Sequence, residues 1–231
     1  MRLRFCSLAL VLALAPGAIL AQTPPAPGVS APAPVESSPL PPPSASPAPM
    51  APAPQAPATP SAPGTRTTLF PNPGDQTDVD EGVLAAKPAA VLAGTSNWDD
   101  AFNNLKGAFA RIEGELGKAG IAPTGRPLTV FVHTDDNGFR YEAMVPIAQA
   151  PEGRGELTPE IKFGRTPEGK SFRFVHKDAY DEIDGTYETI TAYLDAKDIE
   201  AQDAFIEEYV SDFTDAQDTN FEVNIYVQPK G

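Results

Sequence analysis

Apolar residues recur at helical spacing in two stretches of the chain. In residues 96–120 they follow one another at intervals of three or four positions: Trp98, Phe102, Leu105, Phe109, Ile112 and Leu116. This spacing predicts a helix with one apolar face. Ser96 and Asp99 together resemble an N-cap, and Gly120 predicts the end of the helix. A second helix is predicted over residues 180–199, whose apolar face is formed by Tyr180, Ile183, Tyr187, Ile190 and Leu194.

Apolar runs and alternating patterns around these two stretches predict strands. The expected strands are residues 87–96, 126–134, 139–148, 160–165, 170–176, 205–212 and 220–229. The turn sequences DDNG and TPEG stand between neighbouring strands and predict two hairpins. The order is strand, helix, hairpin, then hairpin, helix, two strands. This order predicts an α+β fold of two similar halves, each with a helix on antiparallel strands.

Two adjacent glutamates lie inside the strand predicted over residues 205–212. Side chains alternate between the faces of a strand, so Glu208 shares a face with Ile206, whereas Glu207 lies between Phe205 and Tyr209 on the other. A buried carboxylate without a partner is costly. Glu207 is therefore expected to be solvated at an edge, paired with a basic residue, or placed in a cavity that admits a cation.

Ahead of these elements, the chain begins with features of an export signal. Arg2 and Arg4 precede a short apolar run, and small residues follow up to Ala21, so we predict a signal peptide over residues 1–21. Export would place the protein in the periplasm or outside the cell. An uncleaved membrane anchor is the alternative. A lipoprotein is not expected, because the single cysteine, Cys6, lies inside the apolar run.

Residues 22–66 are almost entirely Pro, Ala and Ser. So few residues that could bury apolar surface predict an unfolded, extended linker, with a proline-rich recognition segment as the alternative. Globular composition begins near Thr67, so residues 67–231 are predicted to form one domain.

Charge and motif content exclude several classes of function. The net charge of −14 argues against nucleic acid or membrane surfaces as direct partners. No motif for a metal, a phosphate loop or a hydrolytic triad occurs, so we expect neither a metal nor a cofactor. His133 with Asp135 and Asp136 is explained by a turn. The carboxylate between aromatic side chains is the candidate that remains, and it suits a flat cation.

The second half resembles the GyrI-like effector-binding domain, a small-molecule module of multidrug-responsive transcription regulators. The approximate pattern of that family is H-x-G-P-Y, a helix with Y-x-x-L, W-E-x-Y-x-x-D and a terminal E-I-Y-x-P strand. The matching segments here are HKDAYDEIDGTYETITAYL (176–194), FIEEYVSD (205–212) and FEVNIYVQP (221–229). YEAMVPI (141–147) resembles the family's E-x-x-x-P-V strand. The resemblance thus covers residues 87–231.

The resemblance implies two strand-helix-strand-strand repeats related by a pseudo-twofold axis, with a ligand cleft between them. It also implies that Glu207 is the acid that meets cationic ligands and that Tyr209 is the motif tyrosine. Asp178 and Ala179 replace the family's Gly-Pro, so a different start of the second helix and a more acidic cleft are expected. The ligand-binding residues that we predict are Glu207, Tyr209, Phe205, Tyr187, Tyr180 and Tyr141.

Three functions are consistent with the sequence. The first is an exported domain that captures small amphipathic or cationic molecules. The second is a hydrolase of electrophilic small molecules, in which Glu207 is the general base and Tyr209 or Tyr187 the acid. The third is a protein-interaction domain whose cleft has closed. The sequence indicates no particular protein partner, and a transcription regulator is not expected of an exported chain.

Overall fold

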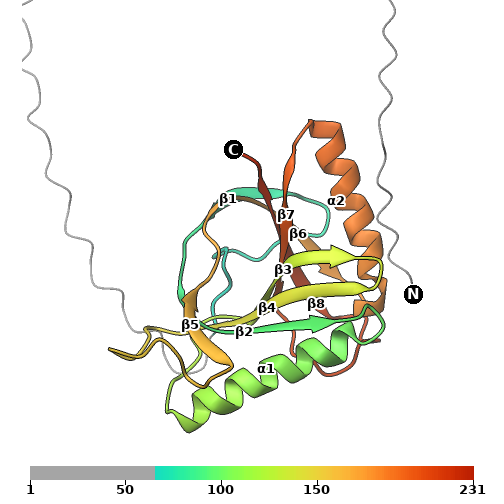
Figure 1. Ribbon diagram of the computed structural model, residues 1–231. Helices are drawn as coiled ribbons and strands as arrows, with labels where there is room; N and C mark the ends of the chain where they lie inside the picture. Colours follow the sequence, from blue (N-terminus) through green and yellow to red (C-terminus); the bar gives the residue numbers. More distant parts are fainter. Residues whose placement is uncertain (1–65) are drawn as a thin grey trace, which may run out of the picture. The chain divides into compact units, whose positions relative to one another are not determined.

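The computed structural model describes residues 66–231, which form an antiparallel sheet with two helices on one face (Figure 1). The predicted signal peptide and all of the predicted linker except Arg66 lie outside the described residues. The order of elements is β1 (Asp80–Leu84), β2 (Pro88–Ser96), α1 (Ala101–Lys118), β3 (Leu128–Asp135), β4 (Gly138–Pro146), β5 (Ile161–Arg165), β6 (Gly169–Lys177), a 3₁₀ turn (Tyr180–Glu182), α2 (Ile183–Lys197), β7 (Ala201–Tyr209) and β8 (Glu222–Pro229).

The sheet has the strand order β1-β6-β8-β7-β3-β4-β2-β5. Its six central strands divide into two halves, and each half follows the order strand, helix, strand, strand. The halves meet where β3 pairs with β7, with Thr129 opposite Glu207 and Phe131 opposite Phe205. The α+β class and the pseudo-symmetric repeats predicted from the sequence are therefore confirmed.

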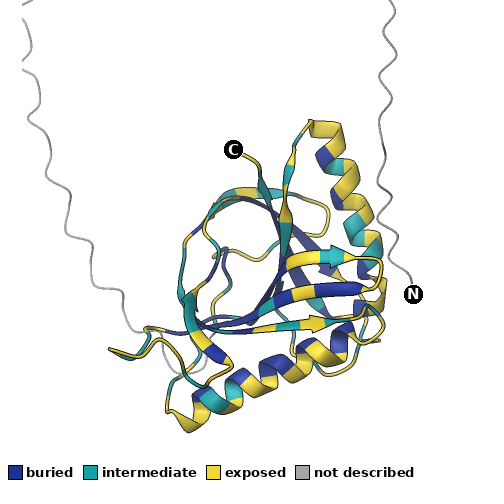
Figure 2. Ribbon diagram, in the orientation of Figure 1, coloured by how far each residue is buried: buried dark blue, intermediate teal, exposed yellow. Residues whose placement is uncertain are grey.

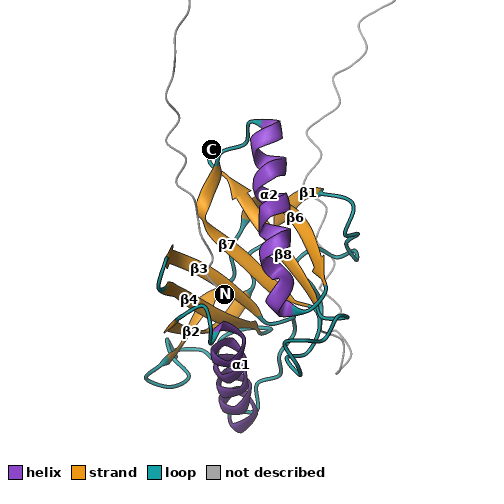
Figure 3. Cartoon of the chain, turned by 90° about the vertical axis from the view of Figure 1, so that its right-hand side faces the viewer, coloured by secondary structure: helices purple, strands orange, loops and turns teal. Residues whose placement is uncertain are grey.

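Both helices pack on one face of the sheet and form the larger core with it. The buried residues of α1 include five of the six that the helical spacing predicts, among them Leu105, Ile112 and Leu116. α2 contributes Ile183, Ile190 and Leu194. Figure 3 shows α2 lying over β6, β7 and β8, and α1 lying by the other half of the sheet. Neither of these described helices has the length and apolar character that would allow it to cross a membrane.

A second core lies on the opposite face of the sheet. Leu69 and Phe70, which precede the first strand, cover Leu128, Ile206 and Tyr226 there. The ring of Phe70 meets Tyr226 edge-on, with centroids 5.1 Å apart. The central strands are consequently buried on both faces, as the dark blue strands of Figure 2 show.

Three local predictions differ from the structure. Ser96 ends β2, and α1 begins only at Ala101 with Asp100 as its N-cap residue. The hairpin predicted around TPEG does not form, because β5 pairs with β2 at one edge of the sheet and β6 pairs with β1 and β8 at the other. Turn residues predict that the chain breaks between two strands but not which strands then pair. β1 was not predicted, since its sequence DEGVL has little apolar character.

The sheet is strongly curved, and the connections β1–β2 and β5–β6 lie side by side (Figure 1). The Thr166 amide donates to the Lys87 carbonyl at 2.8 Å, and the Lys87 amide donates to Oγ1 of Thr166 at 2.9 Å.

Candidate functional site

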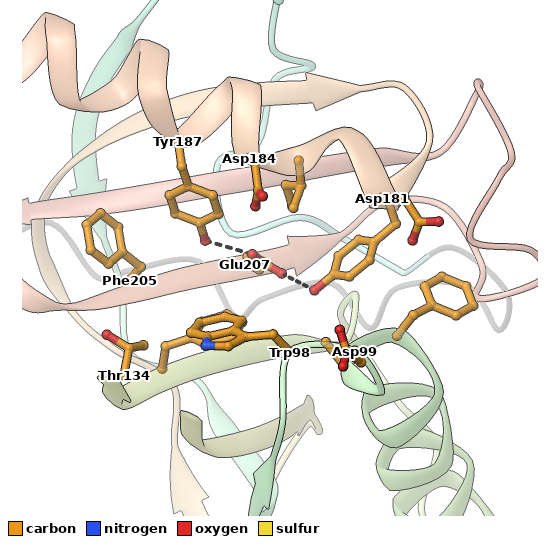
Figure 4. Close-up of a pocket in the computed structure, with 13 residues that line it drawn as sticks. Trp98, Asp99, Thr134, Asp181, Asp184, Tyr187, Phe205 and Glu207 are labelled. Atoms are coloured by element: carbon orange, nitrogen blue, oxygen red, sulfur yellow. Dashed lines mark hydrogen bonds between the residues drawn. The ribbon is translucent and has the colours of Figure 1, made fainter. Parts of the chain in front are cut away.

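A cavity of about 250 Å³ opens between the two halves, where both helices begin (Figure 4). The segment before and at the start of α1 contributes Trp98, Asp99, Ala101 and Phe102 to its lining, and β3 contributes Phe131 and Thr134. The 3₁₀ turn and α2 contribute Tyr180, Asp181, Ile183, Asp184 and Tyr187, and β7 contributes Phe205 and Glu207. Residues from both halves are thus needed to form it.

Glu207 lies in the middle of this cavity wall and is 2 % exposed. Tyr187 donates its hydroxyl to Oε1 at 2.6 Å, and Tyr209 donates to Oε2 at 2.7 Å. The hydroxyl of Tyr180 is a third donor, 3.3 Å from Oε2. The partners of Glu207 are therefore tyrosines rather than the basic residue or bulk water that the sequence left open.

Burial raises the pKa of the Glu207 carboxyl above its ordinary value of 4.5, and the three tyrosine hydrogen bonds oppose that rise. Desolvation and the nearby Glu207 charge raise the pKa values of Tyr187, Tyr209 and Tyr180 well above 10.0. The tyrosines consequently remain donors at neutral pH. A carboxylate held by neutral donors keeps its negative charge available to a cation in the cavity.

The 3₁₀ turn before α2 is positioned by His176, at the end of β6. Nδ1 of its buried ring lies 2.8 Å from Oγ1 of Thr186, and Nε2 lies 3.1 Å from the carbonyl of Ala179. Burial lowers the pKa of His176, which favours the neutral ring. A neutral ring can donate from Nε2 and accept at Nδ1, so both contacts are satisfied. His176 thereby fixes the start of α2 beside Tyr180.

Four of the six predicted ligand-binding residues line the cavity: Glu207, Phe205, Tyr187 and Tyr180. Tyr209 is fully buried beneath Glu207, where its hydroxyl oxygen can also accept from Oγ1 of Thr129, 3.2 Å away. Tyr141 lies outside the cavity. A Cβ atom on its cross-strand neighbour Gly94 would lie 2.5 Å from the Tyr141 ring, which shows that this ring covers the glycine instead.

Sequence reasoning missed several lining residues. Trp98 was assigned to the buried face of α1, but it precedes the helix and donates its indole nitrogen to the carbonyl of Asp135 at 2.8 Å. Asp181 and Asp184 stood inside the motif that carried the resemblance, and their acidity was the available signal. The sequence led us to expect that Asp178 would make the cleft more acidic. Asp178 does not line the cavity.

Metal binding has no support from side-chain geometry in residues 66–231, where no cluster of three or more His, Cys, Asp or Glu side chains suits an ion. His133 lies 3.8 Å from Asp135 on the exposed hairpin.

Comparisons with known proteins agree with the fold described above. The family described as the GyrI-like small molecule binding domain matches residues 78–230, and the chain belongs to that family. No curated protein matches it. The small-molecule binding that defines the family is thus assigned to the described domain.

Three solved structures are similar to this chain. The crystal structure of the EcmrR C-terminal domain aligns with a TM-score of 0.55 and 12% identity, covering 66% of this chain and 97% of that one. EcmrR in its DNA complex aligns with a TM-score of 0.55 and 14% identity. The alignment covers 66% of this chain and 57% of the EcmrR chain. SAV2435 bound to tetraphenylphosphonium aligns with a TM-score of 0.47 and 15% identity, over 67% and 94% of the two chains. At these identities the likeness to the two EcmrR structures shows the fold alone.

Proposed function

We propose that the protein is exported and captures small amphipathic cations in the cavity around Glu207. The observation that supports cation capture most strongly is a buried carboxylate that forms no ion pair among the described residues and is held by tyrosine hydroxyls at an aromatic-lined opening. A cation placed there would gain the charge of Glu207. It would also gain contacts with aromatic rings, each worth about 0.5–2 kcal/mol.

The size of the cavity restricts the ligand class. Cavities for drug-sized ligands span roughly 300–1,000 Å³, so a space of about 250 Å³ suits a molecule of about two aromatic rings. The rings of Tyr187 and Phe205 meet edge to face, with their centroids 5.5 Å apart. Trp98 lies on the other side of Glu207 in Figure 4. A flat cation between these walls would stack on them and meet the carboxylate. The negative net charge and acidic lining give no support for nucleic acid as a partner.

Binding is favoured over hydrolysis by the same hydrogen bonds. A general base must accept a proton from water, but the tyrosine hydrogen bonds stabilise the charged form of Glu207 and so oppose that step. The candidate acids, Tyr187 and Tyr209, have pKa values raised well above 10.0, which makes proton donation to a leaving group unfavourable. An open cavity also argues against a domain whose cleft has closed.

The single tryptophan of the chain lines the cavity, so its fluorescence reports on binding. We would titrate the full chain with 1-methyl-4-phenylpyridinium, and with 4-phenylpyridine at pH 8 as its neutral counterpart. The cation should quench the fluorescence of Trp98 saturably. Glu207→Gln should weaken the affinity for the cation about thirtyfold, as expected when one member of a desolvated charge pair is lost.

Glu208→Gln is the matched control, because Glu208 is equally buried and adjacent but faces the opposite core. It should leave cation affinity within about twofold of wild type, because a side chain that does not contact the cavity is expected to have little effect on binding there. Equal binding of the cation to wild type and Glu207→Gln, or equal binding of the neutral compound, would overturn the proposal. So would the absence of any saturable quenching in folded wild-type protein.

A further inference from the structure

Carboxylates line the mouth of the cavity as well as its centre. Asp181 comes from the 3₁₀ turn just before α2, Asp184 from the first turn of α2, and Asp99 from the segment before α1 (Figure 4). With Glu207 they make four acidic side chains, and within residues 66–231 no lysine, arginine or histidine lines this cavity. A single positive charge at Glu207 would leave Asp181 and Asp184 without a cation beside them.

The helix geometry makes this acidity notable. Both α1 and α2 begin at the cavity, and helix N-termini carry a partial positive charge that favours anions. In this chain the start of α2 carries Asp181 and Asp184, and Asp99 stands just ahead of α1. Aspartates are favoured at such positions for helix stability alone. Here, however, their side chains also line the cavity, so they place negative charge beside two helix N-termini.

The aspartates from α2 have no basic partner among the described residues. Asp181 accepts a hydrogen bond from the neutral amide of Gln217, which leaves its charge uncompensated. Asp184 is half-buried, and burial together with the like charge of Glu188 raises the pKa of its carboxyl. Repulsion of this kind is relieved when a positive charge binds close by. A ligand that carried a second cation at the mouth would provide that relief.

We propose that the cavity prefers dications over monocations of the same shape, with one positive charge at Glu207 and the second at Asp181 and Asp184. This inference rests on the proposed function and names its substrate class: rigid, two-ring organic dications. The aromatic walls would contact the rings, and the two groups of carboxylates would select the charge at each end. Asp181 and Asp184 are thus specificity-determining residues, whereas Glu207 is required for either class of cation.

The test compares two compounds of nearly equal size that differ by one charge. The monocation is 1-methyl-4-phenylpyridinium and the dication is 1,1'-dimethyl-4,4'-bipyridinium, both followed by quenching of Trp98 in the full chain. Two additional exposed charge contacts predict an affinity about tenfold higher for the dication at low salt. The preference should shrink at about 0.5 M salt, because the mouth is accessible to counterions.

The double variant Asp181→Asn/Asp184→Asn keeps the size of both side chains and should reduce the preference to about threefold or less. The matched control is Asp195→Asn/Asp198→Asn, which removes the same charge from two exposed positions at the C-terminal end of α2, outside the cavity lining. It should retain most of the preference, since charges that do not face the ligand are screened by solvent. Circular dichroism would show that all variants are folded.

An unchanged preference in the aspartate variant, or an equal loss in the control, would overturn this inference. In either case binding of the monocation, lost in Glu207→Gln, would leave the proposed function intact. If neither cation binds the wild-type protein, the proposed function itself fails. The two failures are therefore distinguishable.

Discussion

Glu207 and Glu208 are neighbours in the sequence but occupy different environments. Glu207 faces the cavity, whereas Glu208 faces the second core and is fully buried. Oε1 of Glu208 accepts from the Leu69 amide at 2.6 Å, and Oε2 accepts from Tyr226 at 2.7 Å and Asn224 at 3.0 Å. Strand alternation was enough to predict this separation. The partners of each glutamate were not predictable, because they come from segments distant in the sequence.

Cation binding should depend on pH through Glu207. Its pKa is raised above 4.5 by burial, so the carboxylate that a cation needs is present above that raised value and is lost as the pH falls through it. We expect the affinity for 1-methyl-4-phenylpyridinium to fall with a midpoint above pH 4.5. Quenching titrations between about pH 4 and pH 8 would measure this.

The other titratable groups at the site must be considered when the pH dependence of binding is interpreted. Tyr180, Tyr187 and Tyr209 stay protonated throughout, because their pKa values are raised. Asp184 also has a raised pKa, so its asparagine variant serves as the control for the contribution of the mouth. A midpoint at or below pH 4.5 would show that burial does not perturb Glu207 as described.

Glu208→Gln should destabilise the fold without affecting the cavity. The carboxylate satisfies three donors, and an amide in its place presents its own donor to one of them. We expect a loss of about 1–3 kcal/mol, the usual cost of leaving a buried polar group unsatisfied. Urea denaturation followed by circular dichroism would measure it. Unchanged stability would show that the hydrogen bonds accepted by Glu208 do not stabilise the fold.

At the scale of elements, the segment containing Leu69 and Phe70 acts as a cover for the second core. Both side chains are buried, and the backbone of each is bonded to a buried polar group: Leu69 to Glu208 and Phe70 to the hydroxyl of Tyr226. Arg66, assigned from the sequence to the linker, donates to Glu113 on α1 at 2.5 Å. The sequence placed the domain boundary from composition, which contains no information about such contacts.

Two N-terminal truncations should separate the cover from the residues before it. A chain starting at Arg66 should melt at the same temperature as the full protein, because the contacts described above are all retained. A chain starting at Asp75 loses Phe70, and removing a buried phenylalanine side chain costs about 3–5 kcal/mol, so its melting temperature should fall by about 10 °C.

Phe70→Ala in the full chain provides the matching point variant. Calorimetry on the three proteins would decide the question. A large drop for the chain starting at Arg66 would show that residues 22–65 contribute to folding and would contradict the linker prediction.

At the scale of the whole molecule, the sequence patterns that predicted the α+β class were local and strong. The patterns that determine which strands pair were neither. The spacing from Phe102 to Leu116 predicted α1 because a helix is stabilised by contacts within one segment. The partner of β5 depends on which edge remains open after the rest of the sheet has formed. Trp98 was placed wrongly for a related reason, since its position depends on the hairpin that accepts its indole hydrogen bond.

Export is a prediction about the whole chain. If the signal is cleaved after Ala21, the protein recovered from a secreting host should begin at Gln22 and should contain no cysteine. Intact-mass measurement would detect both. A mass that includes residues 1–21 in the membrane fraction would favour the anchor alternative.

The two outermost strands are short in comparison with those they cover. β1 and β5 have five residues each, whereas their inner neighbours β6 and β2 have nine. β1 carries Asp80 and Glu81, and β5 carries Lys162 and Arg165. Short, charged edges are poor templates for pairing between molecules. Removal of β1 would expose the long, largely buried β6 as a new edge, so a truncation past Leu84 is expected to cause aggregation.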